Sequence, residues 1–129
     1  MITSLYAGIL ALIFVALGVY VIMGRYKTHT PLGDGGNEDL QRRVRMHGNF
    51  AEYVPLALLL LVLYETQAGS LYLIHAFGIA LVAGRLSHAY ALKTGFFPAR
   101  GLGMALTFSV IGILGIILIL KGITATQVL

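Results

Sequence analysis

RRVRMHGNFAEYVPLALLLLVLY, residues 42–64, places a strongly charged segment directly in front of one of the most apolar runs in the chain. The apolar run alone, residues 56–64, is too short for the ~30 Å hydrocarbon core of a bilayer, which needs ~20 helical residues. No proline interrupts residues 38–54, so a helix that begins near Glu38 would reach roughly 40 Å at ~1.5 Å per residue. The pattern predicts a helix that begins outside the hydrocarbon and continues into it, with Asn37 as its N-cap.

The remainder of the chain is equally apolar. Hydrophobic residues make up 58% of the 129 residues and charged residues only 11%, far below the ~25% charged residues of soluble domains. Three further stretches, residues 2–24, 71–92 and 102–120, are long enough to span a bilayer. We therefore expect an all-α fold: one integral membrane domain, residues 1–129, built as a four-helix bundle with helices at about 2–24, 38–66, 70–93 and 99–121. The first helix lacks a basic leader and a small-residue cleavage site, so we expect a retained anchor.

The basic residues predict the orientation of the bundle. Eight of the nine lysines and arginines fall at the helix ends that share one side of such a stack, and only Lys121 falls on the other. The positive-inside rule then puts both termini outside and the 1–2 and 3–4 connections in the cytoplasm. The chain has no cysteine, so any sulfur chemistry must be supplied by a ligand. Neither a calcium-loop pattern nor a histidine pair at ligand spacing indicates a metal site.

Polar residues form a stripe along the predicted second helix. At ~100° per residue, Arg42, Arg45, Asn49 and Glu52 fall within an arc of roughly 80°. Asn49 and Glu52 lie too deep to reach headgroups, so they should face protein or a water-filled cavity. For Arg42 and Arg43, anchoring to lipid phosphates at the interface remains an equally good interpretation.

Arg85 interrupts the predicted third helix, with His88 one turn further on nearly the same face. One interpretation is a structural ion pair between Arg85 and Glu52, but it leaves other basic residues near this end without a partner. Those basic residues are Arg45, His88 and Arg100. The other interpretation is an anionic guest that carries more than one carboxylate and one ammonium group, because arginine grips carboxylates bidentately and Glu52 accepts an amine. Glutathione has this inventory and also supplies a thiol. A further histidine, His75, is predicted to be a hydrogen-bonded interior residue.

These residues resemble a known family. Arg45-x-x-x-Asn49-x-x-Glu52-Tyr53-x-Pro55, followed by GR and His88 in the third helix, resembles the MAPEG superfamily, the membrane-associated proteins in eicosanoid and glutathione metabolism. Within it, GDGG, HGN and AGRLSHAY are similar to the bacterial inner-membrane YecN-like branch. Length and four-helix layout agree over nearly the whole chain.

The resemblance implies a homotrimer that binds glutathione between neighbouring protomers near the cytoplasmic side of a bacterial inner membrane. The implied glutathione-binding residues are Arg45, Asn49, Glu52, Tyr53, Arg85 and His88, with Arg25 or Lys27 contributed by the adjacent protomer. Arg100, in the sequence PAR, is the implied catalytic residue that stabilises the thiolate. The implied activity is that of a glutathione transferase or peroxidase acting on lipophilic small molecules from the bilayer, with lipid as a further partner and no nucleic acid.

This chain departs from the family's prostaglandin and leukotriene synthases at two positions. Leu92 stands where those synthases carry a tyrosine, and Met104 stands one turn after Arg100. No eicosanoid substrate is therefore assumed. Two alternatives stay open: a non-catalytic protein that binds glutathione or lipid, and a small proton-coupled exporter in which Glu52 is the essential acid.

Overall fold

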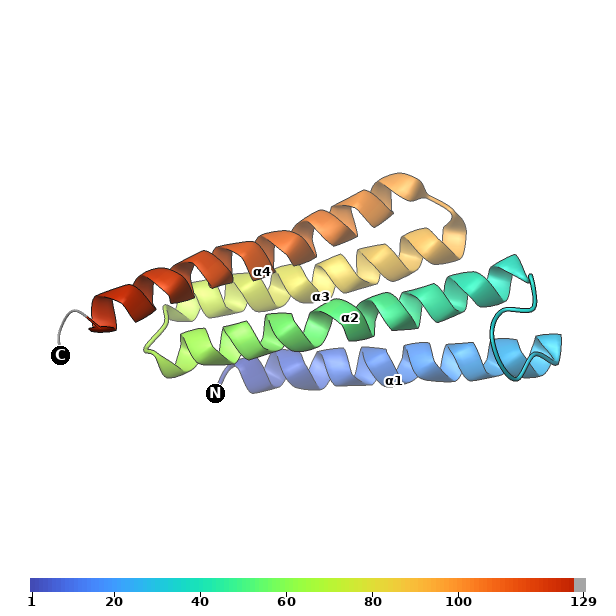
Figure 1. The fold of residues 1–129 in the computed structure, drawn as a ribbon, viewed down its shortest axis with the longest axis horizontal. Helices are drawn as coiled ribbons and strands as arrows, with labels where there is room; N and C mark the ends of the chain where they lie inside the picture. Colours follow the sequence, from blue (N-terminus) through green and yellow to red (C-terminus); the bar gives the residue numbers. More distant parts are fainter. Residues whose placement is uncertain (127–129) are drawn as a thin grey trace.

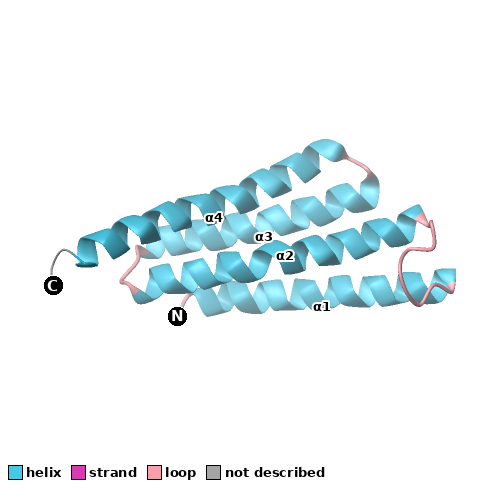
Figure 2. Ribbon diagram, viewed as in Figure 1, coloured by secondary structure: helices cyan, strands magenta, loops and turns pink. Residues whose placement is uncertain are grey.

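The computed structural model describes residues 1–126, and these form four long antiparallel helices (Figure 1). The helices are α1 (Thr3–Thr28), α2 (Glu38–Thr66), α3 (Leu71–Thr94) and α4 (Phe97–Thr126). Helix α1 continues to Thr28 rather than residue 24, and α4 runs from Phe97 rather than residue 99. The last three residues of the predicted domain, 127–129, lie outside the described residues. Figure 2 shows helices and short connections only, and no strand occurs among residues 1–126.

Local side-chain chemistry sets the helix ends. The side chain of Asn37 accepts a hydrogen bond from the backbone N–H of Leu40 at 2.9 Å, which confirms the predicted N-cap of α2. At the opposite end of α2, the Glu65 carboxylate accepts the backbone N–H groups of Ile2 and Thr3. The end of α2 therefore supplies a cap for the start of α1, whose first amides have no partner within their own helix.

The helices pack around an apolar core in the part of the bundle nearer to the start of α1 and the α2–α3 connection. Its fully buried members come from all four helices and include Leu10, Ala57, Leu61, Leu81 and Leu114. The outer faces carry many exposed leucines, isoleucines and phenylalanines, as expected where lipid is the solvent. All four helices are long and apolar enough to cross a membrane. The start of α1 and the end of α4 lie at one end of the bundle, with the α1–α2 and α3–α4 connections at the other (Figure 1).

Helices α1 and α2 meet along a seam that contains polar residues. The ring of His47 stacks on Phe14 with centroids 4.5 Å apart, and it lies against Gly18 of α1. One turn earlier on α2, the Arg43 guanidinium lies over the ring of Tyr20, 3.9 Å from its centroid. We call this contact region of α1 and α2 the α1–α2 seam.

Arg43 is fully engaged within the α1–α2 seam. It donates to the Tyr20 carbonyl at 3.0 Å and pairs with Asp39 at 2.9 Å, and its side chain is only 11% exposed. The phosphate-anchor interpretation of Arg43 is therefore wrong, because the guanidinium has turned inward onto α1. Gly24 makes this possible, since a Cβ there would lie 2.7 Å from Cδ of Arg43.

A second polar contact joins α1 to α3 near the other end. The Tyr6 hydroxyl and Nδ1 of His75 are 2.7 Å apart, which confirms His75 as a hydrogen-bonded histidine. Gly78 faces the Tyr6 ring so closely that any side chain at this position would overlap it. The contact ties α3 to α1.

Candidate functional site

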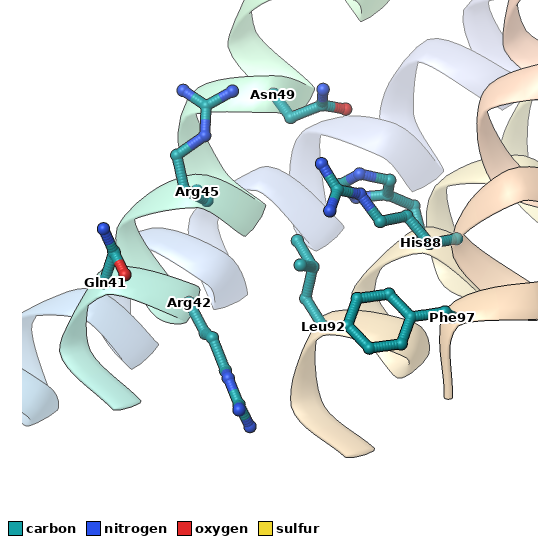
Figure 3. Close-up of a pocket in the computed structure, with 8 residues that line it drawn as sticks. Gln41, Arg42, Arg45, Asn49, His88, Leu92 and Phe97 are labelled. Atoms are coloured by element: carbon teal, nitrogen blue, oxygen red, sulfur yellow. The ribbon is translucent and has the colours of Figure 1, made fainter. Parts of the chain in front are cut away.

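At the end that carries the α1–α2 and α3–α4 connections, a cavity of about 220 Å³ lies between α2 and the facing ends of α3 and α4 (Figure 3). Its lining residues are Gln41, Arg42, Arg45, Asn49, His88, Leu92, Phe97 and Arg100. Three are arginines, and none of these lining residues carries a carboxylate. We call this cavity the arginine pocket.

The α2 wall of the arginine pocket follows from helix periodicity. Once Asn37 fixes the start of α2, residues 41, 42, 45 and 49 recur at spacings of three and four and share one face. Arg42 lies 3.8 Å from Glu38, and both side chains are substantially exposed. Arg45 lies 3.6 Å from Glu52, two turns further along, with both side chains about half exposed. Such exposed pairs are weak and leave the guanidinium groups free for another anion.

Behind the pocket, Arg85 of α3 is only 2% exposed, and its hydrogen-bond partners come from α2 and α4. Its Nη1 donates to Oδ1 of Asn49 at 2.6 Å, and its Nη2 donates to the Gly103 carbonyl at 3.4 Å. Its Nε has no hydrogen-bond partner, and no carboxylate among residues 1–126 pairs with this guanidinium. The Glu52–Arg85 ion pair considered from the sequence is therefore not formed; Glu52 pairs with Arg45 instead.

The position of Arg85 and His88 depends on a close approach of α3 and α4. A Cβ on Gly103 would lie 2.6 Å from the Gly84 carbonyl and 2.8 Å from the His88 amide. Small residues at a crossing let membrane helices come this close. The approach buries His88, which is 3% exposed, and turns it to the pocket. Thr107, fully buried, donates to the Gly103 carbonyl at 2.9 Å and satisfies it further.

The first turn of α4 completes the opposite wall. Phe97 and Arg100 both line the pocket from this turn, one helical repeat apart. Ser87 of α3 donates to the carbonyl of Ala99 at 2.7 Å and ties this turn to α3. Leu92, from the last turns of α3, lies beside Phe97 in the close-up (Figure 3).

Of the eight site residues predicted from the sequence, the structure brings four into the lining of the pocket. These are Arg45, Asn49, His88 and Arg100. Two more, Glu52 and Arg85, touch a lining residue, through Arg45 and Asn49 respectively. The exporter alternative requires a membrane acid without a basic neighbour. Glu52 instead pairs with Arg45, which argues against that alternative.

The remaining two lie away from the pocket. Tyr53 packs edge-on against Phe108 of α4, with centroids 5.3 Å apart. Arg25, at the end of α1, donates its Nη1 to the carbonyls of Thr30 and Gly33 at 3.3 and 2.9 Å. In this chain Arg25 therefore helps to close the α1–α2 loop.

Three lining residues were absent from the set predicted as site residues and from the polar stripe: Gln41, Leu92 and Phe97. Spacing provides a signal for two of them, because Gln41 lies one turn before Arg45 and Phe97 one turn before Arg100. Leu92 was considered only as the residue that replaces a tyrosine. The structure puts its aliphatic side chain in the wall of the pocket.

Comparison with known proteins places the chain among membrane proteins. A profile of the MAPEG family matches residues 3–120. The chain is 36% identical over 108 residues to the inner membrane protein YecN of Escherichia coli strain K12, an alignment that covers 84% of this chain and 82% of that protein. The YecN of Escherichia coli O6:H1 gives the same identity and coverage. No solved structure matches the chain.

Proposed function

The chain belongs to the MAPEG family and is an integral membrane protein. On this premise we propose that it binds glutathione in the arginine pocket and activates the glutathione thiol for reaction with lipophilic electrophiles or hydroperoxides. The location that we propose is a bacterial inner membrane, with the pocket on the cytoplasmic side, as in the positive-inside prediction.

The observation that carries the proposal is the uncompensated positive charge around the pocket. Arg100 has no ion-pair partner among the described residues, and Arg42 and Arg45 have only long, exposed ones. Directly behind them lies Arg85, a buried guanidinium without a carboxylate. Charges at such depth are costly unless paired, which favours an anionic ligand with several carboxylates.

Glutathione fits this charge distribution. Its two carboxylates suit the guanidinium forks of the α2 wall, and Glu52 beside Arg45 is available for its ammonium group. Arg100, on the opposite wall, would then stabilise the thiolate. The thiol proton passes to water, the sulfur forms a bond to an electrophilic carbon, and the leaving group departs with the electrons of the bond that breaks.

The site proposed here is completed by neighbouring copies of the chain. The pocket of one protomer, about 220 Å³, is smaller than the ~300–1,000 Å³ of typical ligand sites. Arg45 and Glu52 are also half exposed on a helix in the membrane, where a charged face needs polar cover. In a homotrimer, the adjacent protomer would complete the wall of the pocket and cover the charged face of α2. Arg25 or Lys27 of that protomer would then reach a glutathione carboxylate.

The test is calorimetry of glutathione binding to the detergent-solubilised protein, combined with ultraviolet absorbance of the thiolate. We expect wild type to bind glutathione and to show the thiolate band. Arg100→Leu should retain binding but lose most of the band, whereas Arg45→Leu should lose binding. An analogue in which a methyl group replaces the thiol controls for absorbance from binding alone. Absence of both binding and thiolate absorbance in the wild type would overturn the proposal.

One observation favours a second function, that of a non-catalytic glutathione binder. Leu92 contributes an aliphatic side chain to the pocket, where the related synthases carry a tyrosine hydroxyl. The same experiment separates the two, because a binder without catalysis binds glutathione but shows no thiolate band.

A further inference from the structure

The two walls of the arginine pocket differ in chemistry. The α2 wall consists of Gln41, two arginines and Asn49, all of them polar. The wall from α3 and α4 instead carries two apolar side chains, Leu92 and Phe97, next to His88 and Arg100. In the close-up, the Phe97 ring extends from the start of α4 towards Leu92, and we refer to these two side chains together as the apolar surface of the pocket (Figure 3).

Phe97 is unusually free for an aromatic side chain. It is 72% exposed, and no aromatic ring among the described residues packs against it. Its position one helical repeat before Arg100 places both side chains on the same face of α4. A group that reacts next to Arg100 would therefore lie on the side of α4 that also carries the Phe97 ring.

The neighbouring Phe96 helps to separate two roles. It is also exposed, at 55%, and lies in the same connection, but it does not line the pocket. Exposed aromatic rings at the end of a membrane helix commonly settle at the lipid interface. Interfacial anchoring therefore applies to both residues, whereas contact with a pocket ligand applies only to Phe97.

Resting on the proposed function, we propose that Phe97 determines the class of the second substrate. Its ring binds a planar aromatic electrophile, held between the apolar surface with Leu92 and the sulfur beside Arg100. In an aryl halide, the thiolate sulfur bonds to the ring carbon and the halide leaves with the electrons of the carbon–halogen bond. Ring-to-ring contact adds to simple burial of apolar area, so aryl groups are favoured over alkyl groups of similar size.

The test compares two glutathione conjugates that need no turnover, S-(2,4-dinitrophenyl)glutathione and S-hexylglutathione. Calorimetry on the full-length protein in detergent measures their affinities in wild type, Phe97→Leu and the matched control Phe96→Leu. We expect Phe97→Leu to weaken the aryl conjugate roughly three- to tenfold, the effect of one aromatic pair, and the hexyl conjugate by less than about twofold. Phe96→Leu should leave the affinity of both conjugates and of glutathione itself as in wild type, because Phe96 does not line the pocket. For Phe97→Leu the affinity for each conjugate is divided by the affinity of the same variant for glutathione, so that any general effect on the pocket cancels.

Two results would overturn the inference about Phe97. If Phe97→Leu lowers the affinity for both conjugates equally, this wall does not select for aromatic groups. If Phe96→Leu lowers the affinity for the aryl conjugate as much as Phe97→Leu does, both rings act only as anchors at the lipid interface. Either result leaves glutathione binding by wild type intact, so the proposed function survives. Wild type that binds neither glutathione nor the conjugates would overturn both proposals together.

Discussion

On the side of α2 that packs against α1, Arg43 is held by the Asp39 carboxylate, the Tyr20 carbonyl and the Tyr20 ring. On the opposite side of α2, Arg85 of α3 donates to the Asn49 amide oxygen and the Gly103 carbonyl but has no carboxylate partner among the described residues. Arginine therefore has two different roles in one bundle. In the α1–α2 seam the protein neutralises its own charge, whereas around the arginine pocket it leaves charge that a ligand can neutralise.

The comparison predicts that the two sides fail differently when they are altered. Changes in the α1–α2 seam should cost stability and leave glutathione binding intact. Changes around the pocket should cost binding and have little effect on stability. The largest expected effect comes from the one contact on which the pocket wall depends, the crossing of α3 and α4.

Gly103→Ala should be the most damaging single change, destabilising the protein by about 1–3 kcal/mol and removing glutathione binding. The added Cβ would meet the Gly84 carbonyl at 2.6 Å and the His88 amide at 2.8 Å, both of them backbone atoms that cannot turn aside. Unfolding by SDS titration measures the first effect and calorimetry the second.

Gly101→Ala, two residues earlier, is the control, because nothing lies within 4 Å of a Cβ at that position. It should be neutral, or more stable by up to about 1 kcal/mol through helix propensity. On the other side of α2, a Cβ on Gly24 would mainly meet the flexible side chain of Arg43, so Gly24→Ala should cost less than Gly103→Ala. Equal costs at the two positions would mean that the α3–α4 crossing is not the tighter contact.

Arg85→Met should weaken glutathione binding about tenfold or more, because it removes a buried unit charge that a ligand carboxylate in the adjoining pocket would otherwise help to neutralise. Stability should change by less than about 1 kcal/mol, because the variant loses a buried charge that has no carboxylate partner. Calorimetry and SDS titration on the same preparations give both values. A large loss of stability with unchanged binding would assign Arg85 to the structure alone.

Arg43→Met should show the opposite result. Loss of the carbonyl hydrogen bond and of the contact with the Tyr20 ring should destabilise the protein by about 1–3 kcal/mol. Glutathione affinity should stay within about twofold, a change of less than ~0.4 kcal/mol, because Arg43 does not line the pocket. If Arg43→Met weakens glutathione as strongly as Arg85→Met does, the difference between the two sides of α2 disappears.

The sequence predicted the four helices and the cap of α2 because both are local properties. A membrane span follows from the length and hydropathy of one segment, and Asn37 caps the helix that follows it directly. Partners across helices were harder to predict. On a helical wheel Asn49 and Glu52 fall within one arc of roughly 80°. Only part of that arc packs against α3 and α4. Asn49 is consequently buried against Arg85, while Glu52 is half exposed beside Arg45.

Leu92 and Phe97 are two further residues whose position in the pocket could not be predicted from local sequence. Whether they reach the pocket depends on how α4 crosses α3, and that crossing is set by the contact of Gly84 with Gly103. Glycines occur at several positions of both α3 and α4, and small residues let membrane helices approach closely in general. Which glycines meet, and so which side of the first turn of α4 faces α2, is a property of the packed bundle.

The smallest expected effect concerns two adjacent acids, Glu38 and Asp39, which pair with arginines on different sides of α2. Glu38 lies 3.8 Å from the pocket residue Arg42, and Asp39 lies 2.9 Å from Arg43 of the α1–α2 seam. Glu38→Gln should leave stability nearly unchanged and tighten glutathione binding by less than about twofold, because an exposed i,i+4 pair contributes only ~0.3–0.5 kcal/mol.

Asp39→Asn is the matched control for Glu38→Gln, since it removes the same charge from the same helical turn. Its partner Arg43 is largely buried, so this change should lower stability slightly more than Glu38→Gln does and leave glutathione affinity unchanged. Salt provides a second check, because the gain from Glu38→Gln is electrostatic and should fade as ionic strength rises. Equal tightening by both variants would mean that glutathione responds only to the net charge of this end of the bundle. Tightening by Glu38→Gln alone would mean that the ligand distinguishes one side of α2 from the other, even between neighbouring residues.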